Sequence, residues 1–217
     1  MKIHSFAGTA SAISTIIREM RDVNIQADRF RFRSNLEKIG ELFAYEISKQ
    51  LRYKPVEVET PLGFSKCYEL EDDVVIAGIL RAGLPMLNGM LRIMDYAEGA
   101  FISAYRQHHK DGSFEVNLQY VTSPDITGKV LIMVDPMLAT GSSIETSLEA
   151  LKACGEPSHI HIVSAIASTP GINYIKRRYK KAELWIGAQD DELTARSYIV
   201  PGLGDAGDLS FGNKLQE

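Results

Sequence analysis

The chain has 217 residues, of which 45% are hydrophobic and 24% are charged, a composition typical of one globular domain rather than of a disordered or fibrous protein. Its formal net charge is −4 and no block of Lys and Arg stands out, so we expect no nucleic acid as its main partner. No apolar run approaches the roughly 18 residues of a membrane helix, so we expect no membrane association.

The first 55 residues are expected to form a helical region. Apolar residues recur at helical spacing along one face of each of two segments. In the first segment they are Ile13, Ile16, Ile17 and Met20, and in the second, roughly 34–51, they are Leu36, Ile39, Phe43 and Ile47. Pro55 ends this region, because proline cannot continue a helix.

From about residue 56 to 190 the pattern changes to short apolar runs separated by helices. The predicted strands are 74–80, 99–105, 129–135, 159–167 and 183–188, and the predicted helices are 84–94 and 142–154. Buried strands that alternate with helices are typical of an α/β domain, so we predict a mainly parallel sheet of about five strands flanked by helices. Residues 108–128 leave this core with a turn at Asp111-Gly112, and form either a lid or a plain surface hairpin.

The stretch 130–151 predicts an anion site. A buried strand ends at Asp135, a loop of small and hydroxyl residues follows at 139–143, and a helix begins near Ser143. Ligands of open α/β sheets bind beyond the carboxyl ends of the strands, and the N–H groups of a helix N-terminus attract phosphate. A carboxylate beside such a loop suits two adjacent sugar hydroxyls, which suggests a ribose 5-phosphate. Alternatively, Asp135 and Ser142 only cap a strand–helix junction.

The stretch 197–213 exposes its backbone through several glycines. Two backbone N–H groups and one C=O would match the acceptor–donor–acceptor edge of uracil. Cytosine would set acceptor against acceptor and donor against donor, and unpaired buried polar groups discriminate strongly. Alternatively, the glycines only serve the turns of a C-terminal loop.

Two arginines follow predicted strands. Arg81 would lie at the carboxyl end of 74–80, beside the phosphate loop, where its planar fork suits a diphosphate. Alternatively, it is a solvated arginine at the edge of the core. Arg106 ends the strand 99–105 at the base of the possible lid.

Four segments resemble the type I phosphoribosyltransferases, and two of them resemble in particular the uracil phosphoribosyltransferase branch. VDPMLATGSS at 134–143 resembles the loop that binds 5-phosphoribosyl 1-diphosphate (PRPP), and YIVPGLGDAGD at 198–208 resembles the C-terminal signature of the branch. ILRAGL at 79–84 and Tyr-Arg at 105–106 resemble the diphosphate-binding segments. The resemblance implies the type I phosphoribosyltransferase fold over the single domain 1–217, with a hairpin lid and a C-terminal hood at about 191–217.

The resemblance also implies the site residues. The catalytic set is Arg81, Arg106, Asp135 and Asp205. The PRPP-binding set is Arg81, Arg106, Asp135, Pro136, Met137, Leu138, Ala139, Thr140, Gly141, Ser142, Ser143 and Asp205, and the uracil-binding set is Ile199, Gly204, Asp205 and Ala206. Ser142 and Leu209 depart from the usual glycine and arginine of the branch. In the family, the loop that corresponds to ILRAGL at 79–84 often has an unusual backbone geometry. We therefore expect a strained or cis peptide near Arg81-Ala82.

The implied reaction is transfer of the phosphoribosyl group of PRPP to N1 of uracil, giving UMP and pyrophosphate. The resemblance implies Mg²⁺ held mainly through PRPP, with no metal site made by the protein alone, and a homo-oligomer. Cys67 and Cys154 fit neither a zinc site nor a disulfide framework, and the N-terminus lacks a signal-peptide layout, so we expect a reduced, cytoplasmic setting. The alternatives are a transferase for another base, a regulatory nucleic-acid-binding protein on the same fold, and an interaction domain with a degenerate site.

Overall fold

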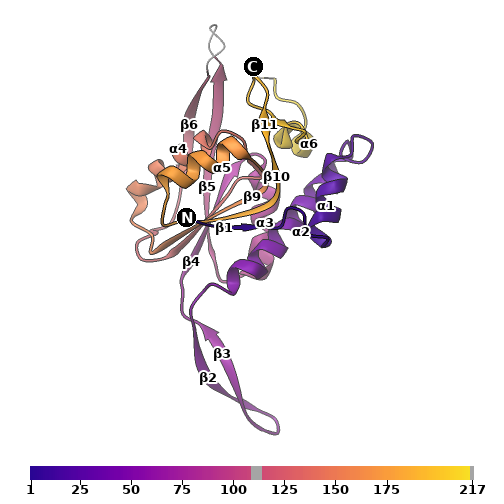
Figure 1. Cartoon of the computed structure of the whole chain (residues 1–217). Helices are drawn as coiled ribbons and strands as arrows, with labels where there is room; N and C mark the ends of the chain where they lie inside the picture. Colours follow the sequence, from indigo (N-terminus) through magenta and orange to yellow (C-terminus); the bar gives the residue numbers. More distant parts are fainter. Residues whose placement is uncertain (109–113, 216–217) are drawn as a thin grey trace.

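A mainly parallel sheet forms the centre of the protein (Figure 1). The computed structural model describes residues 1–108 and 114–215, and of residues 104–108 and 114–118 it describes the backbone only. In spatial order the sheet contains β1 (Lys2–Ser5), β10 (Glu183–Asp190), β9 (His159–Ser168), β7 (Val130–Val134), β4 (Val74–Leu80), β5 (Glu98–His108) and β6 (Phe114–Thr122), and the short β8 (Met137–Leu138) pairs with β9. All pairs are parallel except β5 with β6. The predicted fold class is confirmed.

The sheet is larger than the sequence predicted. The five predicted strands are all present as β4, β5, β7, β9 and β10, but β1, β6 and β8 extend the sheet to eight strands. The short segment β1 lies in the region expected to be helical, and it is a strand because it pairs with β10. The second helix also begins earlier than expected, at Arg29, and ends at Ser48.

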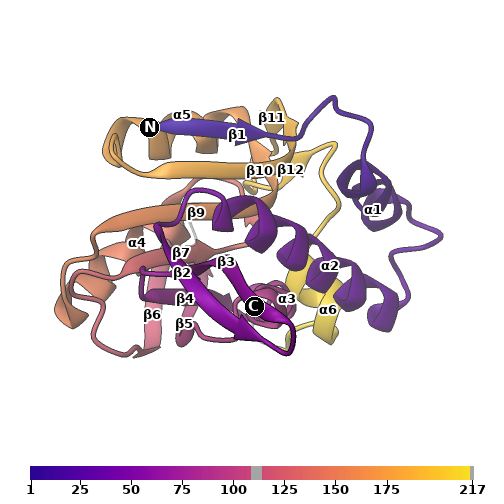
Figure 2. The ribbon, with the colours of Figure 1, turned by 90° about the horizontal axis from the view of Figure 1, so that it is seen from below.

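Helices cover both faces of the sheet (Figure 2). Successive side chains of a strand point to opposite faces, so Val74 and Ile76 of β4 pack on one side and Val75 and Ala77 on the other. The first side carries α1 (Ala12–Arg21), α2 (Arg29–Ser48) and α3 (Gly83–Ile93), and the second carries α4 (Ser142–Leu151), the 3₁₀ turn η1 (Lys152–Cys154) and α5 (Thr169–Arg178). In the part of the chain that the structure describes, no helix combines the length and apolar character that crossing a membrane requires.

Helices α2 and α3 approach each other through two glycines. A Cβ on Gly89 of α3 would lie 1.9 Å from the carbonyl oxygen of Glu37, and a Cβ on Gly40 of α2 would lie 2.1 Å from that of Met86. Both distances are far shorter than any contact between non-bonded atoms, so only glycine allows this crossing. The crossing fixes α3 and therefore the loop that precedes it.

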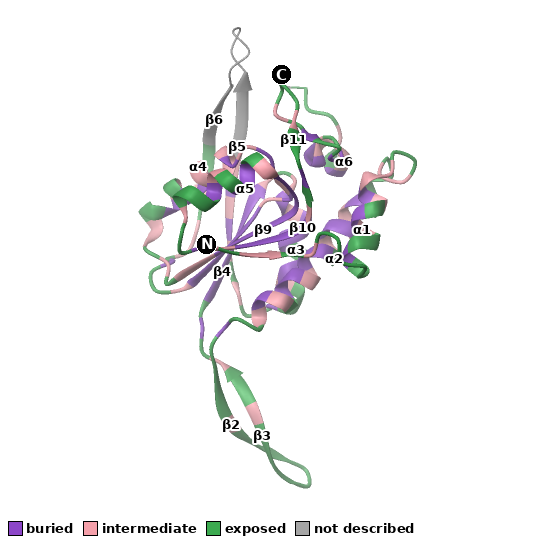
Figure 3. Ribbon diagram, in the orientation of Figure 1, coloured by how far each residue is buried: buried purple, intermediate pink, exposed green. Residues whose placement is uncertain are grey.

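Two hairpins project from opposite ends of the body (Figure 1). Strands β2 (Tyr53–Thr60) and β3 (Gly63–Leu70) pair only with each other, and most of their residues are exposed (Figure 3). Strands β5 and β6 pair antiparallel in the second hairpin, so the described part of 108–128 includes one arm of a hairpin, and its role as a lid stays a prediction. The predicted turn at Asp111-Gly112 lies outside the described residues.

The C-terminal segment forms a small unit above the carboxyl end of the sheet (Figure 1). It contains the two-stranded ladder of β11 (Glu192–Leu193) with β12 (Ile199–Val200), followed by α6 (Ala206–Phe211). Arg33 of α2 donates to the carbonyl oxygen of Ser210 at 2.7 Å, so α6 is attached to the N-terminal helices. We call residues 191–215 the hood.

Candidate active site

The order of the strands places a ligand crevice between β4 and β7. From β4 the chain continues to β5 on one side, whereas from β7 it continues to β9 and β10 on the other. The loops after β4 and β7 therefore leave in opposite directions, which is the position where open α/β sheets bind ligands. Arg81 follows β4 and Asp135 follows β7. A Cβ on Gly83 would lie 3.0 Å from the carbonyl oxygen of Val134, so the two loops are in close contact.

The loop after β7 is held in a fixed shape by its own hydrogen bonds. The N–H of Met137 donates to Oδ1 of Asp135 at 3.2 Å, and the hydroxyl of Ser164 donates to the carbonyl oxygen of Asp135 at 2.6 Å. The Thr140 hydroxyl donates to Oγ of Ser142 at 3.1 Å and accepts from the N–H of Ser142 at 3.3 Å. The Asp135 carboxylate thus stands at the start of a preformed loop.

Gly141 is required where this loop enters α4. It is the N-cap residue of the helix and has a φ of 87°, which glycine adopts without strain. A Cβ there would also lie 2.8 Å from the ring of Tyr174. The loop consequently presents the N-terminus of α4, where backbone N–H groups favour an anion.

The loop and the helix N-terminus enclose a small hollow. It is small, with about 10 Å³ of room for the centre of a water-sized sphere, and part of it is open to solvent. Its walls are formed by Asp135, Met137, Leu138, Ala139, Thr140, Gly141, Ser143 and Ile144. The structure therefore brings together most of the predicted PRPP loop; Pro136 and Ser142 belong to the loop but not to these walls, and Ile144 was not predicted.

Arg81 reaches the hood. Its Nη2 donates to Oδ1 of Asp208 at 2.9 Å and to the carbonyl oxygen of Gly212 at 3.2 Å. The side chain is 40% exposed, so it remains accessible to a ligand. A cis peptide bond lies between Leu80 and Arg81, one bond earlier than the expectation near Arg81-Ala82. Arg106 lies in β5, and its backbone pairs with that of Val116 in β6. The side chain of Arg106 lies outside what the structure describes.

The predicted base-recognition residues lie on consecutive turns of the hood. Ile199 is buried in β12, a cis bond joins Val200 to Pro201, and Gly202 follows with a φ of 56°. A Cβ on Gly202 would lie 2.1 Å from the carbonyl oxygen of Ile199, so this turn also requires glycine. Gly204 is exposed, and Ala206 is the buried first residue of α6.

Asp205 lies in the hood and caps α6. Its Oδ1 accepts from the N–H of Asp208 at 3.0 Å as the N-cap of α6, and its Oδ2 lies 3.2 Å from Nζ of Lys214. Burial acts to raise the pKa of the Asp205 carboxyl, but the Asp208 N–H and the Lys214 ammonium outweigh it and lower the pKa below its ordinary value. A Cβ on Gly207 would lie 3.1 Å from Oδ1 of Asp205 and 3.7 Å from Nη2 of Arg81, so both side chains flank Gly207.

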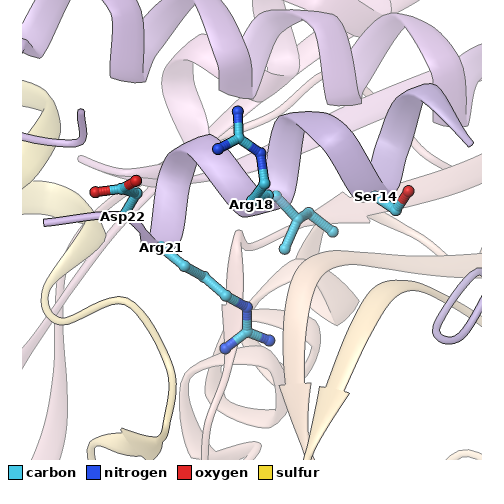
Figure 4. A pocket seen from close by; sticks show the side chains of 5 residues that line it. Ser14, Arg18, Arg21 and Asp22 are labelled. Atoms are coloured by element: carbon cyan, nitrogen blue, oxygen red, sulfur yellow. The ribbon is translucent and has the colours of Figure 1, made fainter. Parts of the chain in front are cut away.

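Two side chains that the sequence did not single out hold this segment. Arg21, at the end of α1, donates to both carboxylate oxygens of Asp190 at 2.8 Å and to the carbonyl oxygen of Gly202 at 2.9 Å. Asp190 ends β10, and this position at the carboxyl edge of the sheet is the signal that could have identified it. Arg21 and Arg18 point in different directions from α1 beside an open hollow of about 500 Å³, which Ser14, Ile17 and Asp22 also line (Figure 4).

A second polar cluster lies at the opposite, amino edge of the sheet. The buried His161 accepts from Nε1 of Trp185 at 3.1 Å, and His4 stacks on Trp185 with 3.6 Å between ring centroids. Burial, aided by the neighbouring His159, lowers the pKa of His161 to about 4. His4 Nε2 also lies 2.5 Å from Glu183. This cluster is remote from the crevice and joins β1, β9 and β10.

Comparisons with known proteins agree with this geometry. The family model described as uracil phosphoribosyltransferase matches residues 8–213. A uracil phosphoribosyltransferase of Porphyromonas gingivalis is 50% identical over 216 residues, which are 99% of this chain and 100% of that protein. One of Pyrococcus furiosus is 37% identical over 207 residues, covering 94% and 88%. A solved protein of Aquifex aeolicus is 30% identical with a TM-score of 0.85, covering 97% of this chain and 99% of that one.

Proposed function

This chain belongs to the uracil phosphoribosyltransferase family, and we propose that it transfers the 5-phosphoribosyl group of PRPP to N1 of uracil, giving UMP and pyrophosphate. The observation that carries the proposal is that the side chains of Arg81 and Asp205 both lie close to Gly207 of the hood, while Arg81 follows the strand next to the Asp135 loop. One end of this arrangement suits a sugar phosphate, and the other suits a flat polar base.

The loop after β7 would hold the ribose 5-phosphate. Its N–H groups and hydroxyls, at the N-terminus of α4, suit the 5-phosphate, and the carboxylate of Asp135 suits the two ribose hydroxyls. Since the loop is already held by internal hydrogen bonds, little order has to be imposed when the sugar binds. The ribose C1 would then be fixed relative to the hood.

The arginines would stabilise the leaving diphosphate. The bond from C1 to the diphosphate oxygen breaks as uracil N1 attacks, so negative charge accumulates on pyrophosphate and positive charge on the sugar. The planar guanidinium of Arg81 would exchange its contact with Asp208 for a diphosphate oxygen. Arg106, at the carboxyl end of the neighbouring strand, would supply a second clamp.

The hood would read the base. The turn from Ile199 to Ala206 presents backbone next to Asp205, and backbone donors to O2 and O4 would favour uracil that has lost its N1 proton. A separate side-chain base is then not required. This hypothesis explains why the segment needs glycines at Gly202 and Gly204, where φ is positive.

Magnesium fits this site as an ion carried mainly by the substrate. Mg²⁺ keeps several waters and is usually bound by one or two carboxylates together with substrate phosphates. Among the described side chains, no group of three or more His, Cys, Asp or Glu is arranged to hold a metal by itself. The carboxylates of Asp135 and Asp205 are the groups that would meet the ion, which supplies positive charge to the leaving diphosphate.

The decisive experiment measures pyrophosphate release from the purified chain with PRPP, magnesium and each nucleobase in turn. Release with uracil alone is expected. Release with a purine or orotate would keep the PRPP site but contradict the assignment of the base. No release with any base, despite PRPP binding, would contradict the proposal and favour a regulatory protein.

We further propose a homo-oligomer. The β2–β3 hairpin supports it, because Phe64 and Tyr68 on one face of the hairpin are 72% and 78% exposed. Side chains of this kind at such exposure suit burial against another copy of the chain. Light scattering of the wild type and of Phe64→Ser/Tyr68→Ser tests this: the variant should have the lower mass, and an unchanged mass would exclude the hairpin as the interface.

A cytoplasmic location completes the proposal. Cys67 in β3 and Cys154 in η1 are both free thiols, as a reducing compartment maintains them. Fractionation of cells that express the native chain would test the location.

A further inference from the structure

Both polar groups of the Gly202 backbone form hydrogen bonds with side chains. Its N–H donates to Oδ2 of Asp190 at 3.0 Å, and its carbonyl oxygen accepts from Nη1 of Arg21 at 2.9 Å. The same two side chains bind each other, since both nitrogens at the end of the Arg21 fork donate to Asp190 at 2.8 Å. The result is a closed triangle of hydrogen bonds from α1 to β10 to the hood. We call Arg21, Asp190 and Gly202 the triangle.

Two of the three members of the triangle are buried. The Asp190 side chain is 6% exposed and Gly202 is buried, whereas the Arg21 side chain is 23% exposed. Removing one partner from such a network leaves a buried charge or amide without its hydrogen bonds, which is costly. The backbone at Gly202 therefore has one favoured position while the triangle is intact.

The carbonyl oxygen of the next residue, Leu203, also has a partner in the N-terminal helical region. Gln26 lies in the connection between α1 and α2, and with its amide turned to donate, it contacts the carbonyl oxygens of Leu203 at 2.8 Å and Met20 at 3.1 Å. Together with the triangle, this contact holds three successive peptide groups, from Pro201 to Gly204. The residues proposed to meet uracil, Gly204 to Ala206, begin directly after them.

We propose that Arg21 and Asp190 are positioning residues for recognition of the base, acting through Gly202 and without touching the substrate; this inference rests on the proposed function. The backbone donors and the acceptor that read uracil have no rotamers of their own, so their directions depend on how the turn is anchored. A loosened turn would misplace them while leaving the Asp135 loop, on the other strand, unchanged. The triangle thus affects the affinity for uracil more strongly than the affinity for PRPP, to which Asp205 is the one residue of this turn proposed to contribute.

A second buried carboxylate provides a matched control. Asp72, at the amino end of β4, has a side chain that is 7% exposed, and it accepts from Nε of Arg52 at 2.8 Å and from the N–H of Arg52 at 2.7 Å. Asp72 and Asp190 therefore share their burial, their arginine partner and a backbone donor. They lie at opposite edges of the sheet. Substituting either residue is therefore expected to lower stability, whereas only substitution of Asp190 is expected to weaken recognition of uracil.

The experiment compares Asp190→Asn and Asp72→Asn. In Asp190→Asn the new amide N–H₂ would face the Arg21 guanidinium, donor against donor, and the turn would lose its anchor. We expect the KM for uracil to rise by about tenfold or more, with the KM for PRPP and kcat changed by less than about threefold. Arg21→Lys should act in the same direction, because lysine cannot bind two carboxylate oxygens and Gly202 together. Asp72→Asn should leave both KM values unchanged.

Amide hydrogen exchange of the peptide containing 199–206 provides a readout that does not depend on activity. Exchange should be faster in Asp190→Asn than in the wild type and Asp72→Asn. Equal exchange in all three, or equal KM changes for uracil and PRPP, would overturn the inference. A wild type that does not turn over uracil would overturn the proposed function instead, and exchange would then decide the inference alone.

Discussion

Replacing Asp205 by asparagine separates its role in the site from its role in the fold. The side chain of Asp205 caps α6 by accepting from the N–H of Asp208 at 3.0 Å. Asparagine caps helices about as well as aspartate, and its oxygen can accept the same bond. The substitution therefore removes the negative charge while keeping the shape and the cap.

The expected loss of stability is small. What disappears from the folded protein is the contact with Lys214 at 3.2 Å, between side chains that are 28% and 49% exposed. Partly exposed pairs of this kind contribute about 0–1 kcal/mol. For a chain of this size, 1 kcal/mol lowers the Tm by about 2–4 °C, so the Tm should fall by no more than that.

The expected loss of activity is much larger. Asp205 and Arg81 both flank Gly207 of the hood, and a preorganised charged group in a site of this kind is worth about 100-fold or more in rate. We therefore expect kcat/KM for pyrophosphate release with uracil to fall by at least about 100-fold, or about 2.7 kcal/mol.

The control for this assay is a helix N-cap residue with no proposed role in the site. Asp28 is the N-cap of α2 and accepts from the N–H of Arg31 at 3.1 Å, so Asp28→Asn is the same change in the same kind of cap. Calorimetry and initial rates of both variants give the two losses side by side. If Asp205→Asn loses activity only in proportion to its stability, or if Asp28→Asn is equally inactive, the assignment of Asp205 to the site is refuted.

Three further outcomes are expected. Uracil should be preferred over cytosine by orders of magnitude in initial rate, because cytosine reverses the donor order at the base edge, and comparable rates would contradict reading by the backbone. The pKa of buried His161 is lowered from 6.5 to about 4, so the unfolded chain binds its proton first and stability falls as the pH drops from about 6.5 to 4; denaturant titrations should show up to ~3 kcal/mol of this loss in the wild type and not in His161→Asn. Gly89→Ala, whose Cβ would lie 1.9 Å from the Glu37 carbonyl oxygen, should lower stability by about 3 kcal/mol or more, whereas Gly99→Ala, with its nearest neighbour at 3.6 Å, should change it little in the same titration.

The sequence predicted the buried strands well because a strand that is buried on both faces is an uninterrupted run of apolar residues. β4 and β7 were expected at 74–80 and 129–135 and are found at Val74–Leu80 and Val130–Val134. Their runs have no polar residue to interrupt them, and a helix follows each within a few residues. The phosphate loop could be located for the same reason, since a strand, a short loop and a helix follow one another in the chain.

Elements and contacts that depend on partners far along the chain have no comparable pattern in their local sequence. β1 is four residues long, three of them polar, and only its pairing with β10, far along the chain, makes it a strand. The β2–β3 hairpin is mostly exposed, so it lacks the apolar run that identified the core strands. Arg21 and Asp190 are 169 positions apart, and nothing near either of them in the sequence signals the other.

The anchoring of Gly202 couples the turn in the hood to the packing of α1. Arg21 ends α1 and Gly202 lies 181 positions later in the chain, so the turn is held by a segment that is distant in sequence. If α1 opened away from the sheet, the turn would lose this anchor even while the central strands stayed paired. Substitutions that loosen α1 against the sheet therefore change the hood without lying in it.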